Sequence, residues 1–509
     1  MKRLTTAAII LAAVVFFAVT GELLLSRKVE QKLQKTNISV FNIESGKINF
    51  SPFSKQLELE EITINSVSDF GEGTVQKVNI TGIELIPFIL KGAIHVKTIE
   101  IIKPSLKIAS NLDSLLHVYS VPESSPEISI ENLSVEDAGI LIYQWLQNTD
   151  TVFYSGLNLQ VEDILKERNA TFSLDETNFE IQNLELDNFK WNIPNGLYSA
   201  SFKNGELNSD KRNIKISNFK FATRYKKYEV GRVTKTQIDW LSFTIENFSV
   251  NDIDLQNAIQ QKMIISKLAL IEGMNGWIFR DRRLPFPRKP DSRLPVEMLE
   301  NVNLKFYCDS VILKDGELIY QEHVRNADNS GKISFNNLQA QLSPVGNIDS
   351  LMTGPMILSA QARLMKRPLL KAEFTFPHGN NKKYNATGSL ESSDFKTFNS
   401  MVNSAASARV KEGRLKRLKF NFSYNDFYSS GKVEMEYENL RVEILDRGDN
   451  QSKLVKTFVL NQFGIKNSNL SSEKSYKKGE ISFERDRKKS IFNYWWKSVL
   501  SGIKDVAFK

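Results

Sequence analysis

The chain has 509 residues, enough for about three ordinary domains or for one elongated architecture. Apolar residues make up 41% of the sequence and charged residues 25%, a balance that is typical of folded proteins and excludes a mainly disordered chain. The formal net charge is +8, because 67 basic residues stand against 59 acidic ones. This small excess of positive charge mildly favours binding to anionic membranes and gives little support to a nucleic-acid-binding groove. Cys308 is the only cysteine, which excludes a disulfide within the chain.

The N-terminus combines a basic tip, Met1–Arg3, with an almost wholly apolar run from Leu4 to Leu25. As a helix this run spans roughly 33 Å at ~1.5 Å per residue, enough to cross the hydrocarbon core of a bilayer. We therefore expect residues 1–25 to form a short cytoplasmic tip and an uncleaved single-pass anchor. A cleaved signal peptide, with its apolar region at Ala7–Val19, is the alternative. The expected anchor side chains include Leu4, Ile9, Val14, Phe17 and Leu24.

After the anchor, short sets of alternating apolar residues predict β-strands. The clearest stretch is Gln76–Ile108, in which apolar residues recur at every second position. This period places the apolar side chains on one face of a strand and the polar ones on the other. The parity slips between sets, as it does where bulges or tight bends interrupt strands. Glycines and prolines mark these breaks, at Gly82, Pro87, Gly92 and Pro104.

One short pattern, apolar-x-Asn-apolar-x-apolar, recurs at irregular spacing. Apolar residues at these positions require a parity flip between the first and the second, and asparagine tolerates the left-handed backbone that suits a bulge there. We expect bulges at these sites, whereas chance matches in an Asn-rich chain are the alternative. The copies are Ile130–Asp137 and Ile245–Asp252, with looser matches at Ile181–Asp187, Ile216–Phe221, Phe335–Ala340 and Tyr437–Val442.

A loop from Arg280 to Pro295 separates two β-rich portions. It carries four prolines and six basic residues, so we expect a solvated linker, with contact to lipid headgroups as the alternative. The expected portions are residues 26–285, 286–393 and 394–489. Within the last two we expect a hairpin of Met356–Arg363 with Leu369–Phe376, a helical segment from Asp394 to Val410 and a final strand at Gly479–Glu484.

The tail, residues 490–509, has the pattern of an amphipathic helix that follows a basic segment. Its tryptophans and its basic entry are typical of a helix at a membrane interface. A helix that packs with its apolar face on the end of the β-structure is an equal alternative. The candidate membrane-interface residues are Phe492, Trp495, Trp496, Leu500 and Ile503.

The sequence offers no constellation for catalysis. The four histidines are far apart in sequence, and neither they nor Cys308 have metal-ligand or nucleophile spacing. There is no phosphate-binding glycine loop and no nucleophile elbow. We therefore expect no catalytic residue, no metal, no cofactor and no enzyme activity.

Several segments together resemble the AsmA-like proteins of Gram-negative envelopes, most closely their Bacteroidetes forms. They are the N-terminal apolar run, "ITGIELIPFILKG" within Val78–Gly92, "IEIIKPSLKI" at Ile99–Ile108, Gly413–Phe422 with Gly431–Leu445, "GEISFERD" at Gly479–Asp486 and the tail. The resemblance implies an inner-membrane anchor with the bulk of the chain in the periplasm, and a mainly β fold. Its sheet would be elongated, curled and largely antiparallel, forming a groove with a few short helices. The family is related in architecture to TamB-like and bridge-like lipid-transfer proteins, which implies lipid transport, outer-membrane assembly and cell-envelope biogenesis, with phospholipid, the membranes and envelope proteins as partners.

An open apolar face is unstable in water unless something apolar fills it. Acyl chains suit such a face, at about 0.8 kcal/mol for each buried methylene. We expect aspartate at Ile80 or Ile245 to block lipid without unfolding the chain. A non-enzymatic scaffold or tether with a closed β-sandwich interior is the alternative. The candidate groove-lining residues are Val78, Ile80, Ile99, Ile101, Ile130, Ile245 and Phe335.

Overall fold

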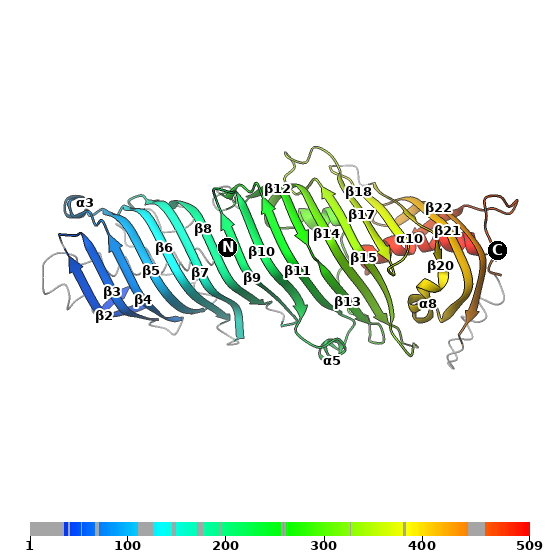
Figure 1. Cartoon of the computed structure of the whole chain (residues 1–509), viewed down its shortest axis with the longest axis horizontal. Helices are drawn as coiled ribbons and strands as arrows, with labels where there is room; N and C mark the ends of the chain where they lie inside the picture. Colours follow the sequence, from blue (N-terminus) through cyan, green and yellow to red (C-terminus); the bar gives the residue numbers. More distant parts are fainter. Residues whose placement is uncertain are drawn as a thin grey trace. The chain divides into compact units, whose positions relative to one another are not determined.

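The computed structural model shows a mainly β protein, whose strands are assigned to one mixed sheet with few short helices (Figure 1). The predicted fold class is confirmed in this respect. The expected anchor and its side chains lie outside the described residues, as does the segment 26–34. The structure describes residues 35–38, 41–51, 53–66, 71–109, 126–144, 149–169, 177–193, 196–255, 258, 261, 263–325, 327–379, 383–445 and 464–508.

Two compact units share the chain: unit 1 comprises residues 1–219 and 249–264, and unit 2 comprises residues 220–248 and 265–509. Unit 1 contains β1 (Lys35–Ile38), β2 (Phe41–Ser51), β3 (Gln56–Ser66), β4 (Gly71–Thr81), α3 (Leu85–Lys91), β5 (Ile94–Ala109), β6 (Ile128–Gln144), β7 (Thr149–Lys166), β8 (Thr177–Asn192) and β9 (Tyr198–Asn208). Residues of β10 (Asn213–Thr223), β11 (Asp239–Asn251) and β12 (Met263–Glu272) are divided between the units.

Unit 2 holds the remaining elements. They are α5 (Glu229–Thr234), β13 (Asn275–Asp281), α7 (Pro295–Glu300), β14 (Lys305–His323), β15 (Gly331–Ser343), β16 (Val345–Gly346), β17 (Met356–Leu364), β18 (Leu369–Phe376), β19 (Tyr384–Leu390), β20 (Ser393–Asp394), the 3-10 turn η1 (Phe395–Phe398), α8 (Asn399–Ala406), β21 (Ala408–Tyr424), β22 (Tyr428–Ile444), β23 (Gly479–Glu484) and α10 (Ile491–Ala507). The predicted hairpin is confirmed as β17–β18, the final strand as β23 and the tail helix as α10. The predicted helical segment Asp394–Val410 is shorter in the structure, where η1 and α8 together end at Ala406.

Successive strands of unit 1 pair with one another from β1 to β9. All these pairs are antiparallel except β5–β6, which is parallel. Unit 2 has one described parallel pair as well, β13–β14. The expected largely antiparallel pairing is therefore confirmed, with parallel pairs that make the sheet mixed.

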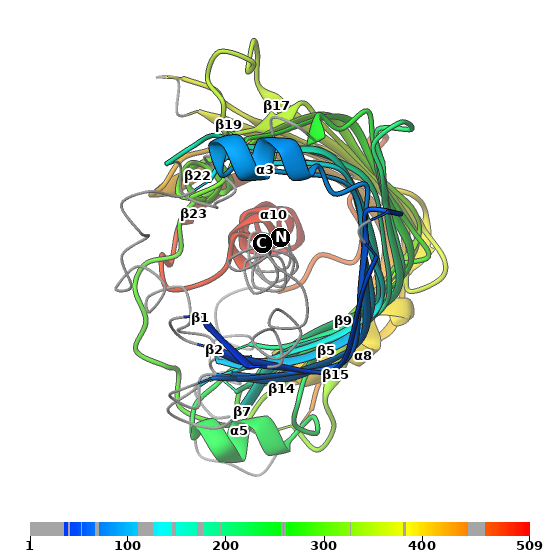
Figure 2. The same cartoon turned by 90° about the vertical axis from the view of Figure 1, so that its left-hand side faces the viewer.

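A line of residues with left-handed backbone crosses the strands of unit 1. Glu61 and Lys103 both lie beside the same part of β4, and Gly156 and Asn204 both lie beside the same part of β8. At Glu61 the flip leaves Leu59 and Ile62 on the same face, both at least 95% buried. The parity slip predicted near Pro104 is therefore a bulge, at Lys103, and bulges of this kind keep the apolar side chains on one face where the strands bend (Figure 2). The breaks predicted at Gly82, Pro87 and Gly92 are instead the connection between β4 and β5, where Leu85–Lys91 forms helix α3 and not a strand.

The asparagine pattern marks bulges at several of its copies. The register shifts at Asn183, at Asn337 and at Asn439. The backbone is left-handed at Asn218, Asn337 and Asn439, with φ of 52°, 49° and 55°. At Asn132 the parity flips between buried Ile130 and Leu133 without left-handed backbone at the asparagine. The predicted bulges are thus confirmed at Asn183, Asn218, Asn337 and Asn439, whereas Asn132 shows the parity flip without a register shift and Asn247 has no left-handed backbone. Alternation in the sequence predicts two strands in this region, Gly431–Tyr437 and Leu440–Leu445. The structure has one strand instead, because β22 continues through Asn439.

Each unit has its own cluster of buried apolar side chains. The cluster of unit 1 draws on β2 to β9 and is rich in isoleucine, leucine and valine. The cluster of unit 2 contains more aromatic residues, such as Phe422, Tyr437 and Tyr494, and includes side chains of α10.

Candidate functional site

The sheet of unit 2 has an inner face, which we define as the face that carries α10. In-register side chains form two apolar rows across β15, β17, β18, β19 and β21 on this face. In the first row Leu342, Leu358 and Phe374 are half-buried. The second row consists of small residues and Phe420 and is half-buried throughout, so part of this apolar face is accessible. The rows are Leu342, Leu358, Phe374, Ala386 and Phe422, and Ala340, Ala360, Ala372, Gly388 and Phe420.

Ser490 caps the N-terminus of helix α10, where its hydroxyl accepts a hydrogen bond from the Asn493 backbone N–H. It lies on the inner side of the curved strands of unit 2 (Figure 2) and contacts β22 and β23. A side chain on Gly479 would meet the Gly502 carbonyl oxygen at 2.1 Å, so the helix and β23 approach each other closely only because both residues are glycine.

Aromatic and hydroxyl contacts fix the orientation of α10. The Trp495 ring stacks on Phe374 with 4.0 Å between centroids, and the Ser498 and Ser429 hydroxyl oxygens are 2.7 Å apart. The buried stripe on the helix is Tyr494, Ser498, Gly502 and Val506. The alternative prediction, in which the helix packs on the β-structure, is therefore confirmed, but a stripe that includes small residues makes the closest contact.

The five candidate membrane-interface residues of α10 divide into two groups. Phe492 is 68% exposed and Trp496 is 51% exposed. Trp495, Leu500 and Ile503 are half-buried, and Trp495 and Ile503 pack against the core of unit 2. Contact of Phe492 and Trp496 with a membrane stays a prediction.

The candidate groove-lining residues differ in burial between the two units. In unit 1 Val78 pairs with Ile101 and Ile80 with Ile99, and all four are at most 1% exposed. Ile130, at 3% exposure, belongs to the same buried cluster. In unit 2 Ile245 and Phe335 are half-buried. The expectation that aspartate at Ile80 would leave the fold intact is therefore withdrawn, because that side chain belongs to a core.

Sequence reasoning did not single out the half-buried rows of β15, β17 and β18 as candidate residues. The alternation of the predicted hairpin Met356–Phe376 was the available signal, because it places Leu358, Ala360 and Phe374 on one face. What the alternation could not show was which face would carry α10.

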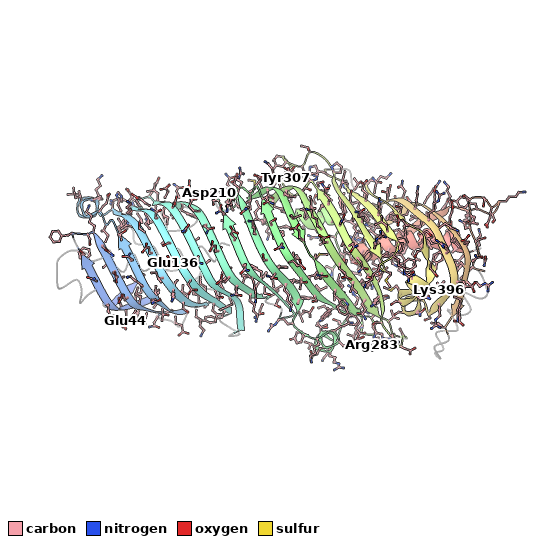
Figure 3. All side chains as sticks on the ribbon, in the orientation of Figure 1. Glu44, Glu136, Asp210, Arg283, Tyr307 and Lys396 are labelled. Carbon is pink, nitrogen blue, oxygen red and sulfur yellow. The ribbon has the colours of Figure 1, made fainter. Side chains whose placement is uncertain are left out.

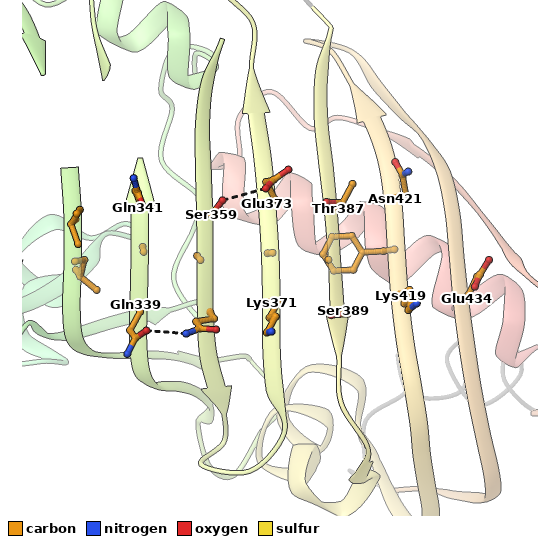
Figure 4. Close-up of a pocket in the computed structure, with 18 of the residues that line it drawn as sticks. Gln339, Gln341, Ser359, Lys371, Glu373, Thr387, Ser389, Lys419, Asn421 and Glu434 are labelled. Atoms are coloured by element: carbon orange, nitrogen blue, oxygen red, sulfur yellow. Dashed lines mark hydrogen bonds between the residues drawn. The ribbon is translucent and has the colours of Figure 1, made fainter. Parts of the chain in front are cut away.

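The outer face of the same strands is polar, and a shallow hollow lies on it (Figure 4). The Gln361 amide donates to the Gln339 oxygen at 2.9 Å, and the Ser359 hydroxyl donates to Glu373 at 3.3 Å. In Figure 4 these side chains point away from α10, which lies behind the sheet. Most of the long side chains that line this hollow are polar, and the row of Ala340, Ala360, Ala372, Gly388 and Phe420 borders it as well.

The inner face becomes charged where β13 and β14 end. Ile278 pairs with Tyr320, and two residues further along Arg280 pairs with Glu322. The Arg280 guanidinium donates to Asp239 at 2.7 and 2.5 Å, and the Tyr320 hydroxyl donates to Glu322 at 2.9 Å. Burial, and then the Glu322 carboxylate, raise the pKa of Tyr320. Figure 3 labels Arg283 in the loop that follows β13.

An exposed apolar patch lies at one edge of unit 1. Phe53 is 101% exposed, Ile86 71% and Leu90 77%. The Ile83 amide donates to the Lys55 carbonyl at 3.2 Å, which places the β2–β3 turn beside the start of α3. Lys55 and Lys91 are exposed in the same two segments. Apolar side chains beside lysines suit an anionic lipid surface.

Groups that could act in catalysis have structural contacts. His323 contacts the Tyr228 hydroxyl at 3.1 Å and the Ala327 carbonyl at 2.9 Å. His95 lies between Glu84 and Glu127, and Cys308 is buried. Across the part of the chain that the structure describes, no cluster of histidine, cysteine and acidic residues could hold a metal ion.

No protein-family model matches the chain, and no curated protein matches it. Among the described residues, no helix combines the length and the apolarity that crossing a bilayer requires.

Proposed function

We propose that this chain is an AsmA-like lipid-binding protein, anchored in the bacterial inner membrane by the apolar run Leu4–Leu25, with its bulk in the periplasm. In this proposal phospholipid acyl chains lie on the inner face of unit 2 and move toward the outer membrane or support its assembly. The half-buried apolar rows, with Leu342, Leu358 and Phe374 in the first, carry the proposal.

The physical argument rests on the contrast between the two faces of one sheet. The outer face carries glutamines, lysines and glutamates, which water solvates (Figure 4). The inner face carries partly accessible apolar side chains, and covering them gains roughly 25 cal/mol for each Å² removed from water. An acyl chain supplies apolar area without demanding hydrogen bonds. Such binding would have low selectivity, and no bond would be made or broken.

A non-enzymatic scaffold or tether is the second candidate. Two observations favour it: the apolar face of unit 1 is buried like an ordinary core, and α10 already covers part of the inner face of unit 2. In this alternative the chain would hold envelope proteins in place and carry no lipid.

Lipid that copurifies with the protein tests the proposal. The full chain would be purified in a mild detergent and its bound phospholipid quantified by mass spectrometry. Ala360→Trp fills the small-residue row of the inner face, and Gln361→Trp adds the same group to the outer face next to it. We expect phospholipid with the native chain and with Gln361→Trp, and a several-fold loss with Ala360→Trp at unchanged circular dichroism. Native protein free of lipid would instead support the scaffold.

A further inference from the structure

A group of cations from three segments gathers at the charged end of the inner face of unit 2. Arg282 follows β13 and contacts Glu322 at 3.1 Å. Lys489 precedes α10, with its ammonium 3.4 Å from the centre of the Phe286 ring, and Lys289 approaches the same ring at 5.5 Å. Lys497 lies on α10 itself; burial, then the charges of Lys504 and Arg282, lower its pKa, and the Glu322 carboxylate opposes this shift. The loop that sequence analysis left as a linker or a headgroup contact thus meets the α10 segment.

The positive charges of this group exceed its negative ones. Among the described residues, no carboxylate lies within ion-pair distance of the Lys489 or Lys497 ammonium. Glu322 is shared between Arg282 and the Tyr320 hydroxyl, and Asp486 affects Lys489 only at longer range. Burial lowers the pKa of both lysines, and the Arg282 guanidinium lowers both further. Like charges held close together are stabilised by an anion.

We propose that Arg282, Lys489 and Lys497 form a binding site for a phosphate group at the charged end of this apolar face. Guanidinium and ammonium groups are the usual protein partners of phosphate, because they donate charge-assisted hydrogen bonds. Half-buried Ile278 and Leu318 lie on the same face next to the site. A phospholipid headgroup could therefore bind the cations while its acyl chains lie on the apolar rows. This reading rests on the proposed function; a free phosphate ion has the same chemistry and is the other source.

Titration calorimetry with soluble probes tests the site. The probes are dihexanoyl phosphatidylglycerol below its micelle concentration, inorganic phosphate, and dihexanoylglycerol, which lacks the phosphate. The variant is Lys489→Gln with Lys497→Gln. The control is Lys371→Gln with Lys419→Gln, which removes the same charge from the exposed outer face. We expect the variant to bind phosphatidylglycerol at least about tenfold more weakly than the native chain and the control.

The other probes separate the two sources of phosphate and the two proposals. Native protein that binds phosphatidylglycerol more tightly than inorganic phosphate, with the excess lost in the variant, identifies a headgroup site. Equal binding of both, lost in the variant, identifies a site for free phosphate. If the variant and the control bind phosphatidylglycerol alike, the site is wrong. Dihexanoylglycerol reports on the apolar face alone: its binding to all three proteins would uphold the proposed function even then, and its failure to bind any would refute that function.

Discussion

The two units use the same alternating pattern of apolar residues with opposite results. In unit 1 the apolar face is a core, in which Leu57, Val78 and Ile101 are completely buried. In unit 2 Ala386 and Phe422 of the first row are buried, but Leu342, Leu358 and Phe374 and the whole second row are half-buried, although α10 packs on part of this face. Alternation therefore identifies an apolar face but does not decide whether that face becomes a core or an accessible surface.

Aspartate substitutions break this comparison most directly. Ile101→Asp in unit 1 would place a charge among fully buried side chains, and we expect it to cost more than about 4 kcal/mol of unfolding free energy. Leu358→Asp in unit 2 leaves the carboxylate partly accessible, and we expect about half that cost or less. Denaturant unfolding measures both. Equal losses of unfolding free energy would show that the two faces are buried alike. A small loss for Ile101→Asp would show that the apolar face of unit 1 is accessible to water.

The contact between α10 and β23 gives the next largest effect. Gly479→Ala places a methyl group against the Gly502 carbonyl, which forces the helix away, and we expect a loss of about 2 to 3 kcal/mol. Gly354 has nothing within 4 Å of an added Cβ, so Gly354→Ala is the matched control, with an expected change between zero and a gain of about 1 kcal/mol. If both variants unfold at the same denaturant concentration, α10 does not pack as described.

Substitutions at the bulges are expected to change stability less, and they act through backbone conformation. Asn337 has φ of 49°, a backbone conformation that valine resists, so Asn337→Val should cost about 1 to 2 kcal/mol. Asn337→Gly should be close to neutral, because glycine adopts left-handed backbone freely. Thermal unfolding of the two variants compares them. A valine variant as stable as the glycine variant would place the bulge elsewhere.

The edge patch of unit 1 gives the smallest effect on stability. Phe53→Ser with Leu90→Ser removes two exposed apolar side chains, and we expect less than about 0.5 kcal/mol in unfolding free energy. Flotation with vesicles of anionic phospholipid should show several-fold weaker binding than the native chain. The control is Ile357→Ser on the outer face of unit 2, where the native side chain is 40% exposed. An equal loss in the control would mean that the patch has no special role.

The strands were predictable from sequence because apolar residues recur at every second position in the stretches between bulges. The β17–β18 hairpin and β23 were recognised this way, whereas α10 was recognised by its amphipathic helical pattern. Where a bulge such as that at Asn439 reverses the parity, the pattern breaks, so β22 was read as two strands. Pairing across a bulge depends on backbone register, which the apolar pattern alone does not specify.

The candidate site was less predictable, because it depends on contacts between distant segments. Nothing in the sequence near Arg282 indicates that Lys489 and Lys497 lie close to it. The tail was recognised as amphipathic, but its use of Ser498 and Gly502 for the close contact depends on the glycine at position 479. Short polar and small residues on a helix do not indicate which strand the helix packs against.

Site-specific photocrosslinking shows whether acyl chains lie on the inner face of unit 2. A benzophenone amino acid would replace Leu358 on the inner face or, in a second protein, Ser359 on the outer face of the same strand. After irradiation in cells with labelled phospholipid, the account predicts lipid adducts at position 358 and none above background at position 359. No adduct at 358, or equal adducts at both positions, would contradict it.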